Sequence, residues 1–172
     1  MKLIIIAIVF AVLLILGGKW LSDNPDTNQQ VNGGGNETKV VAEEKNIPPE
    51  EIVSQGGVHL HPELTITVDG EKQDIPTNIG VGVQYADRPL FDSMMGMANM
   101  HTHDDSGTLH WEVMKGPVTK DDVRLKNFFA IWGKEITEFG TEVTMTVNGE
   151  ENNKLGDYEV KDGDAIVLNY SK

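Results

Sequence analysis

The residues best suited to chemistry lie in one short stretch, residues 100–112, which contains three of the five histidines. Its centre, residues 104–107, is Asp-Asp-Ser-Gly, and small polar residues between β-formers are typical of a tight reversal. We therefore predict a hairpin that pairs His101 with His110 and puts His103 on the same face.

The two faces of this hairpin differ in chemistry. Directly opposed residues of an antiparallel pair share a face, with Cβ atoms about 4.5–5.5 Å apart. One face is expected to carry His101, His103, His110 and Glu112. The other is expected to carry Met100, Leu109, Trp111 and Val113. This division supports the register, because a slip of one residue would mix the two sets.

A second His-x-His, His59-Leu60-His61, precedes the first strong strand pattern, so every histidine belongs to one of two clusters. Imidazole is the commonest metal-binding side chain, and the two-residue period of a strand aims both rings of His-x-His the same way. The pattern predicts a metal site. Its candidate ligands are His59, His61, His101, His103, His110 and Glu112.

The methionines bear on which metal is bound. Five of the seven lie between residues 94 and 114. Thioether sulfur suits Cu(I), while imidazole suits Cu(II) and zinc, so methionines near a histidine site fit copper in either redox state. Methionine also fills gaps in a core. The chain has no cysteine, which excludes thiolate zinc sites, iron–sulfur clusters and disulfides. Copper is favoured, with zinc or nickel as the alternative.

Two other functions are compatible with the same residues. The first is a zinc-type hydrolase or lyase with His101, His103 and His110 as ligands and with Glu112 or Asp104 handling the proton. This geometry is similar to that of α-type carbonic anhydrases, in which His-x-His on one strand and a third histidine on its neighbour hold zinc. The second is a metal-free surface interaction module, in which the histidines are ordinary polar residues of a solvated sheet.

Four motifs together resemble a family of small, membrane-anchored prokaryotic proteins. They are His59-Leu60-His61-Pro62, the segment Ile75 to Gly80 (IPTNIG), the segment His101 to Glu112 (HTHDDSGTLHWE) and the segment Phe128 to Gly133 (FFAIWG). This resemblance implies a common extracytoplasmic domain without a known activity.

The elements that must position these residues are predicted from periodicity and turn signals. Alternating residues at 64–68 and at 143–147 predict strands that end in Asp-Gly and Asn-Gly hairpin turns. Residues 73–82 are expected to form a return strand, residues 120–132 a helix and residues 165–170 a buried strand. We predict an α+β domain with a mostly antiparallel sheet and one main helix, similar to a β-grasp arrangement.

The chain before this domain predicts a membrane tether. Residues 1–20 contain an uninterrupted apolar run from Leu3 to Leu16 and are expected to be an uncleaved signal anchor in the lipid bilayer, with a cleaved signal and secretion as the alternative. Residues 21–51 are polar and acidic, as in a disordered linker, and residues 52–172 form the folded domain.

Charge defines the expected location and partners. The formal net charge is −13 and Lys2 precedes the apolar run, so the amino terminus is expected inside the cell and the domain outside. Such an acidic chain repels phosphate backbones, which excludes nucleic acid as a partner. The expected partners are the bilayer, a metal ion and a membrane or extracytoplasmic metalloprotein.

Overall fold

The computed structural model describes residues 46–172, so the predicted anchor and most of the predicted linker lie outside the described residues. None of the helices in this part of the chain has the length and apolar character needed to cross a membrane. In chain order the elements are η1 Pro49–Glu51, β1 Ile52–Ser54, β2 Val58–Leu60, β3 Glu63–Val68, β4 Glu71–Gln73, η2 Val83–Tyr85, β5 Phe91–Asp92, β6 Met97–Ala98, β7 Met100–His101, β8 His110–Val113, β9 Val118–Thr119, α1 Leu125–Trp132, β10 Glu142–Val147, β11 Glu150–Glu151, η3 Leu155–Asp157 and β12 Ala165–Ser171.

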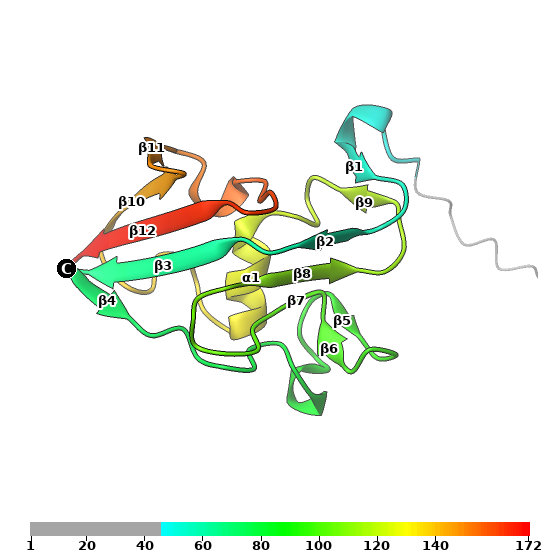
Figure 1. The fold of residues 1–172 in the computed structure, drawn as a ribbon, viewed down its shortest axis with the longest axis horizontal. Helices are drawn as coiled ribbons and strands as arrows, with labels where there is room; N and C mark the ends of the chain where they lie inside the picture. The colour runs from blue at the N-terminus through cyan, green and yellow to red at the C-terminus, as the bar shows by residue number, and fades with distance from the viewer. Residues whose placement is uncertain (1–45) are drawn as a thin grey trace, which may run out of the picture. The chain divides into compact units, whose positions relative to one another are not determined.

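The larger sheet has the strand order β11-β10-β12-β3-β4. Strand β12 runs parallel to β3 and antiparallel to β10, so two hairpins flank a central strand (Figure 1). Both hairpin turns have positive φ at both central residues, 53° and 84° at Asp69-Gly70 and 54° and 86° at Asn148-Gly149. This is the conformation for which Asp-Gly and Asn-Gly are favoured. The two predicted hairpins and the predicted last strand are confirmed.

A smaller sheet, β2-β8-β7, carries His59, His101 and His110, and His61 and His103 lie within two residues of its strands. Strand β2 continues into β3, so one extended segment belongs to both sheets (Figure 1). The pairing of this segment with β8 continues beyond the end of β2. Leu109 N–H donates to Pro62 O at 2.9 Å, and Leu64 N–H donates to Gly107 O at 2.8 Å. Two further sheets have only two strands each, β1-β9 and β5-β6.

The helix is shorter than the predicted span of 120–132, because α1 begins at Leu125. The residues predicted to start the helix, 119–122, form a hydrogen-bonded turn instead. Thr119 N–H donates to Asp122 Oδ2 at 2.7 Å, and Asp122 N–H donates to Thr119 Oγ1 at 3.3 Å. This reciprocal pair satisfies the amides that a helix start would otherwise expose.

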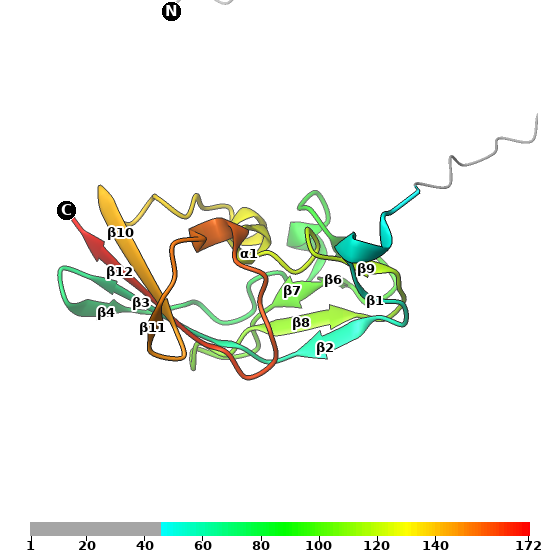
Figure 2. The same cartoon turned by 90° about the horizontal axis from the view of Figure 1, so that it is seen from above.

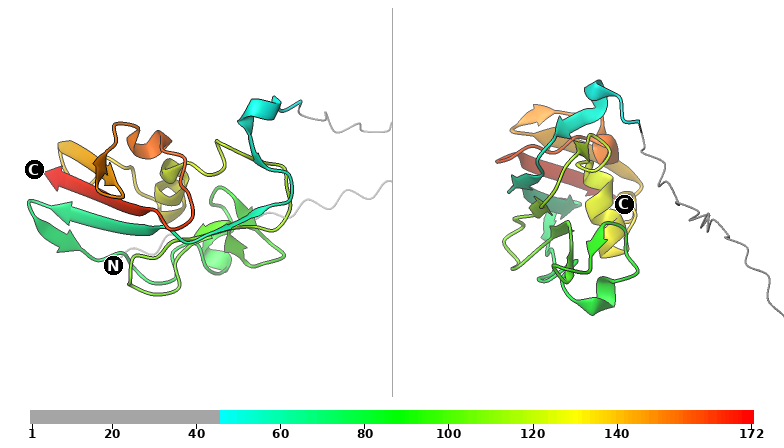
Figure 3. Two further views of the ribbon diagram at one scale, coloured as in Figure 1. Left: turned by 45° about the horizontal axis from the view of Figure 1, so that its top comes forward. Right: turned by 90° about the vertical axis from the view of Figure 1, so that its right-hand side faces the viewer.

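Long-range pairing explains the late start. Leu125 N–H donates to Tyr158 O at 3.0 Å, and Val160 N–H donates to Val123 O at 3.0 Å, so Arg124 is held extended opposite Glu159 and the helix begins only after it. Helix α1 lies on one side of the strands (Figures 2 and 3) and buries Leu125, Phe128, Phe129 and Ile131. These side chains join one apolar core with the inner residues of β3, β8 and β12.

The prediction of a return strand at 73–82 is wrong. Strand β4 ends at Gln73, and turns follow. Proline at 76 has no N–H for a ladder, and Asn78 adopts a left-handed φ of 59°. The predicted fold class is confirmed, because residues 46–172 form a sheet-rich α+β fold with mostly antiparallel strands and one α-helix.

Candidate metal centre

A row of three imidazoles crosses the smaller sheet. Its central strand, β8, lies between β2 and β7. His110 of β8 pairs with His101 of β7, as predicted. On the other side, the register that pairs Leu60 with Trp111 puts His61 beside His110. The ring centroid of His110 is 5.0 Å from that of His61 and 5.5 Å from that of His101.

The neighbouring residues of the same face complete the cluster. His59 pairs with Glu112, and His59 Nε2 lies 3.0 Å from Glu112 Oε1. The ring centroid of His103 is 4.5 Å from that of His110 and 4.7 Å from that of His101. The structure therefore brings all six predicted site residues together. The opposite face is apolar, as predicted, and Met100, Leu109 and Trp111 are fully buried.

His101 is held in one tautomer. Its side chain is fully buried, and Nδ1 lies 3.0 Å from Ala98 O. A carbonyl oxygen only accepts hydrogen bonds, so Nδ1 carries the proton and Nε2 presents its lone pair. A hydrogen bond from the far ring nitrogen to a backbone carbonyl is the usual support of a metal-bound histidine.

The lone pair of His101 faces a second imidazole. His101 Nε2 lies 3.2 Å from His103 Nε2. Two nitrogens bound to one tetrahedral ion at 2.0–2.1 Å would be roughly 3.3–3.4 Å apart. The same distance also suits an N–H···N hydrogen bond donated by His103. This pair therefore has the spacing of two ligands of one ion before any rearrangement.

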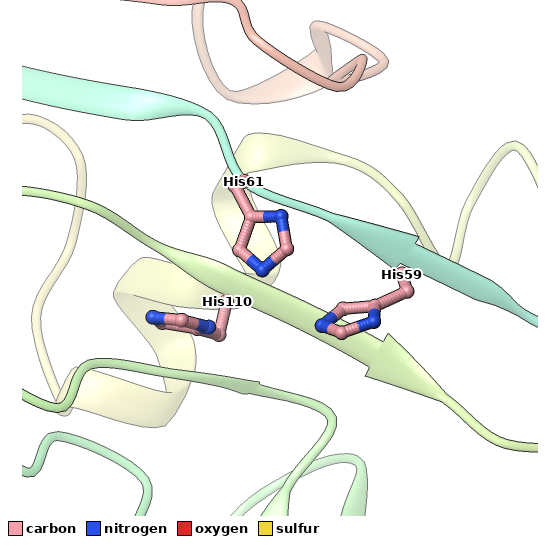
Figure 4. Close-up of side chains that lie close together, drawn as sticks. All are labelled: His59, His61 and His110. Atoms are coloured by element: carbon pink, nitrogen blue, oxygen red, sulfur yellow. The ribbon is translucent and has the colours of Figure 1, made fainter.

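The six residues contain two possible three-histidine sites, each with ligand atoms within 4.8 Å of one another. One comprises His59, His61 and His110, and the other comprises His101, His103 and His110. We call them the outer and the inner triad, because the side chains of His59 and His61 are 61% and 45% exposed whereas His101 is buried. In Figure 4 the ring of His61 lies over the gap between His59 and His110, in front of β8, with α1 behind the strand.

The electrostatics favour neutral rings at the centre. Burial lowers the pKa of His101 below its ordinary value, and the nearby imidazole of His103 acts in the same direction against the hydrogen bond to Ala98. Burial also lowers the pKa of His110, followed by the effects of His103, His101 and His61. A ligand imidazole must be deprotonated, so both rings are in the metal-binding form at neutral pH.

The two carboxylates considered for proton transfer have different roles. Glu112 is part of the cluster, with Oε1 3.0 Å from His59 Nε2 and 4.0 Å from His110 Nδ1. Asp104 instead folds back onto its own turn, where hydrogen bonds from the side chain of Ser106 and, second, from Ser106 N–H at 3.0 Å lower the pKa of its carboxyl. Of the two, only Glu112 is positioned beside the imidazoles.

Sequence reasoning missed the residues that hold the inner histidines in place. The buried Thr102 donates through Oγ1 to Pro76 O at 2.9 Å and accepts from Ile79 N–H at 3.0 Å, while Thr102 N–H donates to Ile79 O at 3.0 Å. Gly80 packs closely enough that a Cβ atom would lie 2.6 Å from Met100 O. Segment 75–80 therefore holds residues 100–102 in place, and we call it the clamp. The sequence signal of this segment is the IPTNIG motif, whose residues alone indicate no structural role.

The methionines bear on the proposed preference for copper, and the structure describes where four of them lie. Met94, Met95 and Met114 line a separate hollow of about 500 Å³ with Asp92, Asn99, Val113 and Lys115, none of which is a histidine. Met100 is buried in the core. Met94, Met95 and Met114 therefore lie in a hollow that contains no histidine, and Met100 belongs to the core.

Comparison with known protein families, curated proteins and solved structures finds no match for this chain. The functional argument therefore depends on the geometry of the histidine face.

Proposed function

We propose that this protein binds a transition metal ion on its histidine face and acts as a metal carrier or accessory protein. The observation that supports this most directly is the continuous cluster of five imidazoles, in which backbone contacts orient the buried His101 with its lone pair toward His103. Lone histidines on a solvated sheet need no such arrangement.

The accessibility of the cluster favours a carrier over a closed structural site. A structural zinc site is fully coordinated and closed. Here the outer triad is open to solvent, because the side chains of His59 and His61 are 61% and 45% exposed. An ion held there can be reached by a ligand from another molecule, such as a membrane or extracytoplasmic metalloprotein.

Copper is the first ion to test. Affinity of a nitrogen site rises along the divalent series to Cu²⁺, and imidazole is a good ligand for it. Zinc is the alternative, because three histidines with one open position also suit Zn²⁺. The methionine hollow has no histidine, so this choice depends on the imidazoles alone.

Equilibrium dialysis followed by elemental analysis tests the proposal. The full chain in detergent is dialysed against micromolar free Cu²⁺ or Zn²⁺ at neutral pH, and uptake of at least one of the two ions is expected. His101→Ala, His103→Ala and His110→Ala should each weaken binding more than tenfold, whereas Asp105→Asn in the exposed turn should not. If neither ion is bound, a metal-free surface interaction module becomes the better hypothesis.

A zinc-type hydrolase or lyase is the second candidate, and Glu112 favours it. A carboxylate 4.0 Å from a ligand histidine could accept the proton of a metal-bound water. The zinc-loaded protein is then expected to hydrolyse an activated ester or hydrate a carbonyl compound, and Glu112→Gln should abolish that activity while zinc remains bound. A carrier would show no turnover in either form.

The proposed location is outside the cytoplasm, tethered by the amino-terminal apolar segment. The apolar run at 3–16 and the acidic linker support it. We also propose that the larger sheet and α1 form a β-grasp-like unit. The two hairpins flanking β12 and the parallel pairing of β12 with β3 support this assignment.

A further inference from the structure

The two triads share one residue, His110, and this sharing limits how the cluster can be filled. His110 lies on the central strand, between the outer His61 and the inner His101. One imidazole nitrogen binds one ion. Two ions could use His110 together only if it lost its second ring proton and bridged them, and the two cations would repel each other.

The triads also differ in accessibility and in support. The side chains of His59 and His61 are 61% and 45% exposed, so an ion or a donor protein can reach them directly, and in the inner triad His103 is exposed as well. His101 is fully buried and has its Nδ1 hydrogen-bonded to Ala98 O, so it loses little side-chain freedom when it binds. The outer triad is therefore suited to capture and the inner triad to retention.

We propose that the two triads are alternative sites for a single metal ion, which enters at His59 and His61 and moves to His101 and His103, with His110 as the ligand residue common to both sites. This inference rests on the proposed metal-binding function. The transfer is a ligand exchange without redox chemistry, in which each metal–nitrogen bond that breaks at the outer triad is replaced by one that forms at the inner triad. Glu112 Oε1 lies 3.0 Å from His59 Nε2, and this contact forms again when the ion has left His59.

The test compares loading and release of Cu²⁺ in the full chain in detergent. Elemental analysis after dialysis gives the stoichiometry, and stopped-flow quenching of tryptophan fluorescence gives the rates. We expect one Cu²⁺ per chain. The double variant His59→Ala/His61→Ala should load at least tenfold more slowly. His103→Ala, at an exposed position, should instead release Cu²⁺ to a chelator at least tenfold faster.

His110→Ala should impair both loading and retention, because it removes the shared ligand. His101→Gln supplements His103→Ala, and the circular dichroism spectrum of each variant is compared with that of the unchanged protein to show that it folds. Two Cu²⁺ ions per chain would overturn the proposal, as would loading of the His59→Ala/His61→Ala variant at the unchanged rate. A chain that binds no Cu²⁺ or Zn²⁺ would instead overturn the proposed function itself.

Discussion

One carbonyl group determines how His101 can act. Ala98 O accepts a hydrogen bond from Nδ1–H of His101. The buried ring therefore offers only the lone pair of Nε2, which lies 3.2 Å from His103 Nε2. The sequence predicted that His101 and His103 share a face. It could not predict which nitrogen would be free, because the tautomer depends on a carbonyl whose position is set by the tertiary fold.

The lowered pKa values of His101 and His110 make the metal-free fold sensitive to acid. The unfolded chain binds protons at the ordinary histidine pKa of about 6.5, whereas the folded rings bind them only at lower pH. The unfolded state then holds more protons, so the free energy of unfolding falls as pH drops below that value. For His101 the slope is at most about 1.4 kcal/mol per pH unit.

Urea unfolding of the chelator-treated protein at pH 7.5 and pH 5.5 measures this effect, and His101→Gln should reduce the difference between the two values. Metal affinity should fall over the same range, because protons compete for the ligand nitrogens. Equal stability at both pH values would contradict the assignment of His101 as a buried neutral ring.

Thr102 is expected to stabilise the inner histidines through its hydroxyl. Thr102→Val keeps the shape of the side chain but leaves Ile79 N–H buried without its partner, which should cost about 1–3 kcal/mol. The matched control is Thr144→Val at an exposed position of β10, which should change the free energy of unfolding by less than about 0.5 kcal/mol. Denaturant titration of both variants checks the difference.

At the level of elements, the sequence pattern predicted those features that depend on interactions between residues close in sequence. Hairpin turns, strand alternation and the register of His101 with His110 depend on residues close in sequence, and these predictions are confirmed. The late start of α1 and the clamp at 75–80 depend on pairing with distant segments, which no local pattern records. For the same reason the approach of His59 and His61 to the hairpin could not be established from sequence.

Gly80 is expected to be essential for the clamp because two requirements meet there. Its φ is +78°, and a Cβ atom would lie 2.6 Å from Met100 O. Gly70 provides a matched control, since its φ is +84° but a Cβ atom would meet nothing within 4 Å. Gly70→Ala should cost only the left-handed strain of about 1–2 kcal/mol. Gly80→Ala should cost more and should weaken metal binding, as measured by urea unfolding and dialysis.

Helix α1 should contribute strongly to stability through Phe128. The ring is fully buried and packs against Phe129 and Trp132, with centroids 5.9 Å away from each. Phe128→Ala is expected to cost about 3–5 kcal/mol. Ala130→Ser on the exposed side of the helix should cost about 0.5 kcal/mol or less. A loss below about 1 kcal/mol for Phe128→Ala would show that the helix does not anchor the core.

At the scale of the whole molecule, the described unit joins two sheets through one strand. The segment from β2 to β3 belongs to both sheets, and His59 and His61 lie on it just before it enters the larger sheet. The larger sheet therefore fixes one end of the segment that carries His59 and His61. This arrangement gives the larger sheet a direct part in positioning two of the candidate metal ligands.

The tether is the last feature to predict, and it concerns residues outside the described part of the chain. A basic amino terminus, an apolar run at 3–16 and an acidic remainder predict an anchor with the folded unit outside the cell. Protease added to whole cells or spheroplasts should then cut within residues 22–50 and release an intact folded fragment that contains all five histidines. That fragment should bind metal like the full chain. A mature protein that begins near Lys19 or later would show instead that the segment is a cleaved signal, and the folded domain would then be free to diffuse.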